Sequence, residues 1–250
     1  MKAQLEIIDQ GKLRALVLCN PRRRNALSLA MMNSLLEALA EAASEKLSAL
    51  ILTSTGSTFS AGADLTDING TLDDLKFDET LEFVKQSIET FPFPVIGAIE
   101  GACIGAAFDL VTSCDMLLVA EGAYFQIPAA RLGLLYNPSS IAKWHTRLGS
   151  SLLSSMLLTG NLLDAKQAVH KGLAIESVPT GKSMERAWQL AEKAAEGNPE
   201  ALSVTKALLR DLDSGSFSAT NWESPRRKLL GSPERRKAVI QAKSKLGIKY

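Results

Sequence analysis

The chain has 250 residues and a formal net charge of +1, with 46% hydrophobic and 22% charged residues. This length can bury a sizeable core, and the composition is too apolar for a disordered protein. A charge this close to zero gives no field that would attract nucleic acid. The most apolar region, residues 94–120, is interrupted by acidic residues, which makes a membrane span too costly.

Cysteine usage and the N-terminal residues indicate the compartment. Cys19, Cys103 and Cys114 are odd in number, sit in apolar runs and lack the spacing of metal ligands. Residues 1–17 are broken by charge every few positions and lack the apolar stretch of a signal peptide. We therefore expect a cytoplasmic protein with buried thiols and no metal site.

Strand and helix patterns alternate through the first half of the chain. Short β-like runs and amphipathic helices follow one another with a spacing that suits a layered α/β core. Ser28 is placed to cap the first helix, and the second helix ends before Pro92. The expected strands are residues 4–8, 13–19, 50–53, 94–99 and 116–119, and the expected helices follow Ser28, span the apolar positions 77–88 and cover 105–113.

Helical signals dominate the second half of the chain. Two helices are expected between residues 150 and 172, the second of them opened by Asp164. A helix over roughly 184–195 ends at Gly197, and Asn198 followed by Pro199 marks the start of the next. We therefore divide the chain into an α/β core at 1–182 and a C-terminal helical lobe at 183–250.

Two segments rich in small residues are candidates for ligand binding. Residues 58–65 end in Ala-Gly-Ala-Asp, where Gly62 permits backbone dihedrals that other residues avoid. This segment fits either a close approach of a ligand to the backbone or a tight turn after a strand. Residues 101–109 form a small-residue loop that leads into a helix, and unpaired N–H groups there would suit a developing oxyanion. Close packing of that helix on a strand is the alternative.

These segments resemble the signature stretches of the crotonase (enoyl-CoA hydratase/isomerase) family. The sequences NPRRRNALS, STFSAGADL and PVIGAIEGACIGAAFDLVTSCDMLLV are similar to the three signatures in the family's order and spacing. The later stretches GLAIESV and SPERR are also similar to family segments. The resemblance covers residues 1–178 well and the remainder more loosely.

The resemblance implies a fold, an assembly and a site. The fold would be a spiral of ββα units with a C-terminal helical lobe, assembled as a homotrimer or as a hexamer made of two trimers. The N–H groups of Ala63 and Ala106 would form an oxyanion hole for the carbonyl of an acyl-coenzyme A thioester. Coenzyme A would enter only as part of the substrate, with no separate cofactor. Residues implied to bind the acyl-CoA are Arg22, Arg23, Arg24, Ala61, Gly62, Asp64, Leu65, Tyr136 and Asn137, and Lys245 would reach the coenzyme A of a neighbouring subunit.

The acid/base residues of the family are only partly matched. Asp109 lies at the position of one hydratase carboxylate and on the helix face of Ala106. A carboxylate in a first helical turn is held ionised by the helix dipole, which favours a role as a base; stabilising the helix start is the alternative. The second hydratase carboxylate falls at Ala129, and the acid of isomerase-type members falls at Asn137. The remaining polar candidates are Glu100, Arg131, Tyr136 and His145.

Three functions are compatible with this pattern. The first is a lyase or isomerase acting on an enoyl-CoA through an enolate, with Asp109 as the proton carrier. The second is hydrolysis or decarboxylation of an acyl-CoA, which needs the oxyanion hole but not the carboxylate pair. The third is an acyl-CoA carrier or sensor without catalysis. An apolar acyl pocket could include Leu72, Phe83, Phe91, Leu135, Tyr136 and Trp144.

Overall fold

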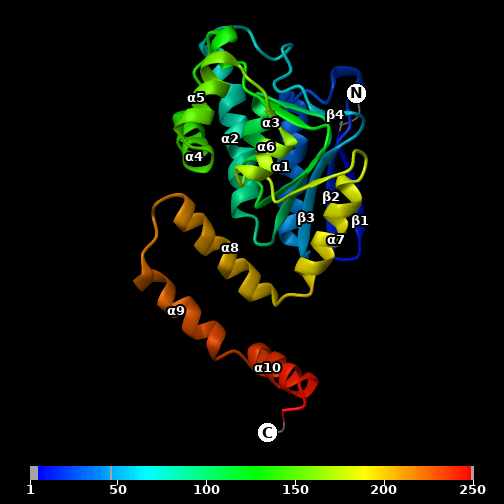
Figure 1. The fold of residues 1–250 in the computed structure, drawn as a ribbon, viewed down its shortest axis with the longest axis vertical. Coiled ribbons are helices and arrows are strands. Elements are labelled where there is room, and N and C mark those ends of the chain that lie inside the picture. The colour runs from blue at the N-terminus through cyan, green and yellow to red at the C-terminus, as the bar shows by residue number, and fades with distance from the viewer. Residues whose placement is uncertain (1–4, 46, 249–250) are drawn as a thin grey trace.

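The main sheet runs through the centre of the molecule, whose computed structural model describes residues 5–45 and 47–248 (Figure 1). Its strand order is β1-β2-β3-β5-β7-β10. β1 is antiparallel to β2, and the other neighbours are parallel. The strands are β1 (Leu5–Gln10), β2 (Leu13–Leu18), β3 (Ala49–Ser54), β5 (Val95–Ile99), β7 (Met116–Ala120) and β10 (Glu176–Val178).

A second, smaller sheet has the order β4-β6-β8-β9. Three successive turns of the chain each give one strand to each sheet: β3 then β4, β5 then β6, β7 then β8. This is the predicted ββα spiral. The sequence analysis did not predict these strands because runs of two or three residues are too short to show a period. They are β4 (Thr58–Ser60), β6 (Ala102–Ile104), β8 (Tyr124–Gln126) and β9 (Leu163–Asp164).

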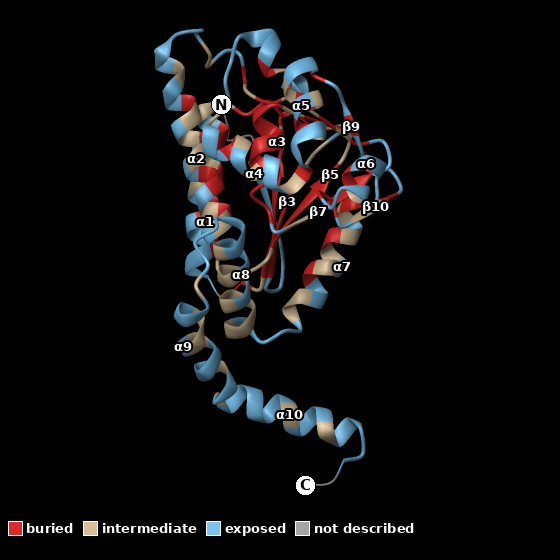
Figure 2. Cartoon of the chain, turned by 60° about the vertical axis from the view of Figure 1, so that its left-hand side comes forward, coloured by how far each residue is buried: buried red, intermediate tan, exposed pale blue. Residues whose placement is uncertain are grey.

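The two faces of the main sheet are covered by different helices. Leu16 and Leu18 of β2 belong to a core shared with α1 (Leu29–Ser44), α2 (Leu75–Thr90) and α3 (Ala106–Val111). Ala15 and Val17 belong to a second core on the opposite face, as the alternation of side chains along a strand requires. Figure 2 shows α7 (Ser183–Ala195) lying along that face, and its Ala187 and Ala191 are buried there.

α7 follows the predicted domain boundary at residue 183 directly. It packs on the core, and the helices that extend away from the core begin at residue 199, while the division into domains stays a prediction. The small side chains of its alanines let α7 approach the sheet closely. The helical sequence, which carries no strand signal, had suggested a separate lobe. Before α7, α4 (Pro138–Leu148) was not predicted, whereas Asp164 opens a helix with a capping box as expected. The other elements of this region are α5 (Ser150–Thr159), α6 (Ala165–His170) and the short 3-10 helices Pro21–Arg23, Leu72–Asp74 and Ala129–Leu132.

The C-terminal helices extend away from the core (Figures 1 and 2). α8 (Pro199–Asp213), α9 (Ala219–Leu230) and α10 (Pro233–Lys245) contain no buried residue. Lys206 connects α8 to the core: its ammonium lies 2.8 Å from the Asp115 carboxylate and donates to the carbonyls of Ile88 and Phe93. Within the described part of the chain, none of the helices is long and apolar enough to span a bilayer. Cys103 and Cys114 are buried thiols as predicted, while Cys19 is half-buried.

Candidate active site

The backbone of the first small-residue segment is fixed by Leu27. The Leu27 N–H donates to the Gly62 carbonyl at 2.7 Å, and the Leu27 carbonyl accepts from the Asp64 N–H at 2.8 Å. Both bonds flank Ala63, so the Ala63 N–H points to the other side, as in any parallel bridge. The Ala63 N–H has no hydrogen-bond partner within residues 5–45 and 47–248.

The second small-residue segment lies directly against the first. Gly62 has a φ of 91°, and a Cβ there would lie 2.6 Å from the Ile104 carbonyl oxygen and 3.4 Å from the Ala106 nitrogen. Only glycine allows both this dihedral and this approach. Ala106 is the first residue of α3, and its N–H also has no partner among the described residues. Because α3 has only six residues, its contribution to a site is this N–H rather than a long helix dipole.

Ala63 and Ala106 line one cavity of about 800 Å³. The polar groups on its wall include the carboxylates of Asp78 and Glu82, which project from α2 and which the sequence analysis did not identify. Burial raises the pKa of Asp78, and the neighbouring Asp74 carboxylate raises it further. Apolar side chains that line the cavity include Ile68, Phe77, Leu81, Leu132 and Leu134.

The predicted acyl-pocket residues are only partly found there. Tyr136 lines the main cavity, and Phe83 and Leu135 line a smaller adjoining pocket of about 380 Å³. Phe91 and Trp144 belong to the buried core instead, whereas Leu72 is exposed. Core packing therefore accounts for Phe91 and Trp144.

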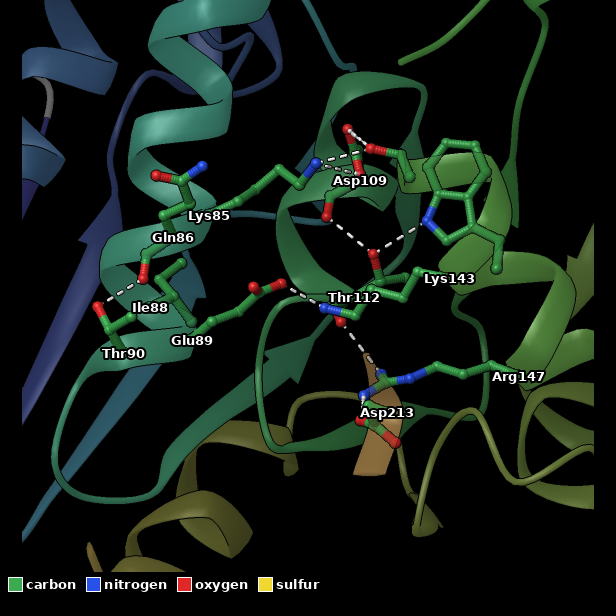
Figure 3. A network of polar contacts seen from close by, with 12 residues as sticks. Lys85, Gln86, Ile88, Glu89, Thr90, Asp109, Thr112, Lys143, Arg147 and Asp213 are labelled. Atoms are coloured by element: carbon green, nitrogen blue, oxygen red, sulfur yellow. Dashed lines mark hydrogen bonds and ion pairs between the residues drawn. The ribbon is translucent and has the colours of Figure 1, made fainter. Parts of the chain in front are cut away.

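Asp109 lies on the cavity wall and is held by a buried lysine (Figure 3). The Lys85 ammonium is 3.1 Å from Asp109 Oδ1, and both side chains are about 95% buried, with exposed fractions of 5% and 4%. Ser140 Oγ donates to Asp109 Oδ2 at 3.0 Å and accepts from Lys85 Nζ at 2.7 Å. Lys85 also bonds to Glu82 at 2.8 Å.

The charges of this cluster oppose the cost of burial. Burial raises the pKa of Asp109, while the Lys85 ammonium and the Ser140 hydroxyl act in the opposite direction. Burial by itself would lower the pKa of Lys85, but Asp109 and Glu82 outweigh it, so that its pKa is raised and the ammonium stays charged. An effect of the helix dipole stays a prediction; the positive charge nearest to Asp109 is the Lys85 ammonium, which the sequence did not connect with Asp109. A lysine between Leu81 and Ile88, on the apolar face of α2, was the sequence signal for it.

Tyr136 places its phenol beside Gly105, the residue before Ala106. A Cβ on Gly105 would lie 2.9 Å from Tyr136 Oη, and the Tyr136 ring packs edge-on against Trp144 at 5.3 Å. Burial raises the pKa of Tyr136, as do the Asp109 and Asp78 carboxylates, so the phenol stays protonated and can donate. Its hydroxyl has no protein partner in the part of the chain that the structure describes.

The three arginines of the predicted coenzyme A site differ. Arg23 lines the cavity and pairs with Asp64 at 2.7 Å and with the Thr66 hydroxyl at 2.9 Å. Arg22 and Arg24 are exposed and do not line it. Burial of Asp64 disfavours its charge, but the bonds from Arg23 and Thr66 dominate and lower its pKa. Asp64 therefore holds the loop together. Coenzyme A binding by the arginines stays a prediction.

The remaining candidates lie in different surroundings. Ala61, Gly62 and Leu65 line the cavity with Ala63, and Asn137 lines it as well while capping α4 through its side-chain oxygen. Ala129 is buried and the amide of Asn137 cannot titrate; that these two residues replace family carboxylates stays a prediction. Glu100 accepts bonds from the N–H groups of Gly181 and Ser183 and so fixes the start of α7. Arg131 and His145 do not line the cavity, and Lys245 ends the protruding α10.

Comparison with known proteins defines the class that this fold and this pair of backbone amides indicate. A profile of the Enoyl-CoA hydratase/isomerase family matches residues 10–238. The chain therefore belongs to this family. It is 32% identical over 214 residues to a 2,3-dehydroadipyl-CoA hydratase of Escherichia coli strain K12, covering 83% of this chain and 82% of that protein.

Solved structures give the same fold. An enoyl-CoA hydratase from Polaromonas sp. JS666 superposes with a TM-score of 0.81 at 27% identity, over 90% of this chain and 89% of the other. A methylmalonyl-CoA decarboxylase in complex with 2-nitronate-propionyl-CoA superposes with a TM-score of 0.80 at 25% identity, over 89% and 87%. The predicted crotonase-like spiral is thus confirmed, and the family contains more than one reaction.

Proposed function

We propose that this protein is an acyl-CoA-processing enzyme that binds a thioester carbonyl between the N–H groups of Ala63 and Ala106 and stabilises its enolate. The observation that carries the proposal is the pair of unpartnered amides on adjoining loops at one cavity. Donors that are fixed in place before the reaction lower the energy of a developing oxyanion. One such donor commonly raises the reaction rate by a factor of about 10²–10³. The fixed bridge to Leu27 and the contact at Gly62 give this preorganisation.

A reaction that needs one proton carrier suits the side chains present. Asp109 would take a proton from the α-carbon of an enoyl thioester, and the electron pair of that C–H bond would delocalise onto the carbonyl oxygen as an enolate. Returning the proton to the γ-carbon moves the double bond, and no second carboxylate and no oxidant is required. Isomerisation of an enoyl-CoA is therefore favoured over hydration, because Ala129 replaces a carboxylate that would activate water.

The cavity supports an apolar acyl group. Its apolar lining and its volume of about 800 Å³ suit a ligand of this size, and Arg23 at its edge can meet a phosphate. The carboxylates of Asp78 and Glu82 on the wall would repel an acyl chain that ends in an acid. For the isomerisation, the acyl chain is thus expected to be neutral.

The test is turnover of 3-enoyl-CoA and 2-enoyl-CoA substrates of several chain lengths by the wild-type protein and by Asp109→Asn. The variant should bind acyl-CoA in calorimetry while kcat falls by about 10²–10⁴. Asp73→Asn, an exposed acid outside the cavity lining, serves as the matched control. Undiminished turnover by Asp109→Asn would remove Asp109 from the mechanism.

A second candidate, decarboxylation, is favoured by Tyr136. Its phenol lies beside Gly105 with no protein partner, where it could donate to a carboxylate on the acyl α-carbon. Loss of CO₂ would leave the same enolate in the same oxyanion hole. Release of CO₂ from malonyl-type thioesters, in place of isomerisation, would favour this candidate.

The third candidate, an acyl-CoA carrier, is favoured by the engagement of both Asp109 oxygens with Lys85 and Ser140. Tight acyl-CoA binding without turnover of any thioester would support it. Hydrolysis of the thioester is a further possible reaction, and release of free thiol from acyl-CoA substrates would detect it. A measurable kcat on any of these substrates would exclude the carrier role.

We also propose that α8, α9 and α10 form the homotrimer contact, with a hexamer of two trimers as the larger form. The helices bury no residue within one chain, yet they expose apolar side chains such as Leu209, Leu230 and Ile240. Sedimentation should give a trimer or a hexamer; a monomer would contradict the assembly. The cytoplasmic location stays a prediction.

A further inference from the structure

Lys85 is a buried cation in a place where packing does not require one. It lies on the face of α2 that also buries Leu81, Val84 and Ile88. Removing a charge from water is costly, and a buried ion pair is often no more stable than apolar residues of the same volume. Stability therefore gives little reason for a lysine here. Its position beside Asp109 suggests a functional reason instead.

The Lys85 ammonium contacts three oxygen atoms, and each contact differs. It donates to Ser140 Oγ at 2.7 Å and to Glu82 Oε2 at 2.8 Å. The third oxygen, Asp109 Oδ1, lies 3.1 Å away, but the angle is not that of a directed hydrogen bond. Asp109 Oδ1 is thus a buried oxygen that lies in an ion pair with Lys85, whereas Oδ2 accepts from Ser140.

Ser140 fixes the other Asp109 oxygen. Its hydroxyl has one hydrogen, which it donates to Asp109 Oδ2 at 3.0 Å, while its oxygen accepts from Lys85. The bond from Lys85 therefore decides which way the Ser140 hydroxyl points. One ammonium acts on both carboxylate oxygens, on Oδ1 by its charge and on Oδ2 through Ser140.

We infer that Lys85 is a positioning residue for the proposed reaction: it keeps Asp109 unprotonated and fixes its orientation, with Ser140 as the bridge. The inference rests on the proposed function, in which Asp109 carries the proton. Lys85 itself touches no reacting atom in this scheme. Its effect is on the pH range in which Asp109 can act as a base.

The charges around Asp109 give the direction of that effect. Glu82 on α2 is negative and favours protonation of Asp109, as does burial, whereas Lys85 opposes both. Asp78 on α2 and the protonated Tyr136 from the segment before α4 also face the cavity next to it. Without Lys85, the groups that remain near Asp109 are negative or neutral, so its carboxylate would bind a proton at a higher pH.

The test compares the pH profile of kcat/KM for the wild-type protein, Lys85→Met and Lys143→Met. Lys143, on α4, is the matched control. It pairs with Glu89, which lies on the same helix as Lys85, but it does not line the cavity. Lys85→Met should move the acidic limb upward by one pH unit or more, so that kcat/KM measured at a pH below the wild-type limb falls at least about tenfold and recovers as the pH rises. Lys143→Met should keep the wild-type limb, and Lys85→Arg should lie close to it.

An acidic limb that is the same in Lys85→Met and the wild-type protein would overturn the inference. A wild-type protein without turnover would instead contradict the proposed function. In that case ¹³C NMR titration of the aspartate carboxyl carbons, with Asp109 assigned from Asp109→Asn, still measures the pKa in both proteins, and an unmoved pKa overturns the inference. If Lys85→Met does not fold, Lys85→Met/Asp109→Asn should fold, because no uncompensated carboxylate is then buried. Failure of the double variant, together with an unmoved Asp109 pKa in Ser140→Ala, would contradict the positioning role.

Discussion

Arg23 and Asp64 form an ion pair of 2.7 Å that joins the polar loop before α1 to the loop carrying the Ala63 amide. Asp64 is 6% exposed and also accepts from the N–H of Thr66 at 3.1 Å. The pair thus lies one residue from a proposed oxyanion donor. Its ionisation state should affect the geometry of the site.

Replacing Asp64 with Asn should destabilise the protein at neutral pH by about 1–2 kcal/mol, since the Asp64 carboxylate accepts charge-assisted bonds but Arg23 is half exposed. The pKa of Asp64 is lowered below its ordinary value of 3.8 in the fold. The stabilisation is therefore present above pH 3.8 and is lost as the pH falls through the lower folded-state pKa. Urea unfolding at pH 7 and near pH 3 should show a difference between the two proteins that narrows in acid. A constant difference would mean that the charge of Asp64 is unimportant.

Gly62→Ala should abolish most activity and destabilise the fold by about 1–3 kcal/mol, because a Cβ would meet the Ile104 carbonyl at 2.6 Å and φ is 91°. Gly56→Ala is the control: its φ is 82°, but nothing lies within 4 Å of its Cβ position. The control has the same dihedral strain without the contact between loops. Thermal unfolding and kcat/KM should separate the two effects, and equal losses in both variants would contradict the role of close approach.

Tyr136→Phe should lower kcat for a malonyl-type thioester by about 10–10²-fold and change isomerisation less, because it removes only the hydroxyl beside Gly105. The ring keeps its contact with Trp144, so the unfolding temperature should stay the same. Equal kcat values for wild type and variant on every substrate would leave the phenol without a role.

Lys206→Met should release α8 from the core. The Lys206 side chain is 10% exposed and pairs with Asp115, so its loss leaves a partly buried carboxylate and two carbonyls with fewer partners. We expect a loss of about 2 kcal/mol in the free energy of unfolding and faster hydrogen exchange in residues 199–213. Lys228→Met removes an exposed ion pair between α9 and α8 and should leave the exchange of α8 unchanged. Unaltered exchange in Lys206→Met would show that other contacts hold α8.

The sequence was most informative where a pattern repeats or a residue has one structural use. The Ser28 cap, the boundary at Asn198 and Pro199 and the apolar face of α2 all predicted the helices that form. Strands of two or three residues, such as β6 and β9, were missed because pairing across the fold creates them. The role of α7 was missed because only the folded structure shows that its alanines pack on the main sheet.

The site was predictable for its backbone and less so for its charges. The glycine and alanine segments indicated Ala63 and Ala106, whose N–H groups need only a loop shape. Lys85 could not be connected to Asp109 from the sequence, because their contact joins α2 to α3 across 24 positions and depends on how these helices pack. Pairings between helices of this kind leave no local pattern.

The amides of Ala63 and Ala106, which have no partner among the described residues, occupy equivalent places in consecutive coils of the spiral. Ala63 follows β4 and Ala106 follows β6, in each case just after the strand given to the smaller sheet. The third coil has Ala129 after β8 at the corresponding place. The proposed carbonyl recognition would thus be a product of structural periodicity that depends on backbone groups, which leaves the later coil and the surrounding helices free to diverge in the chemistry that they add.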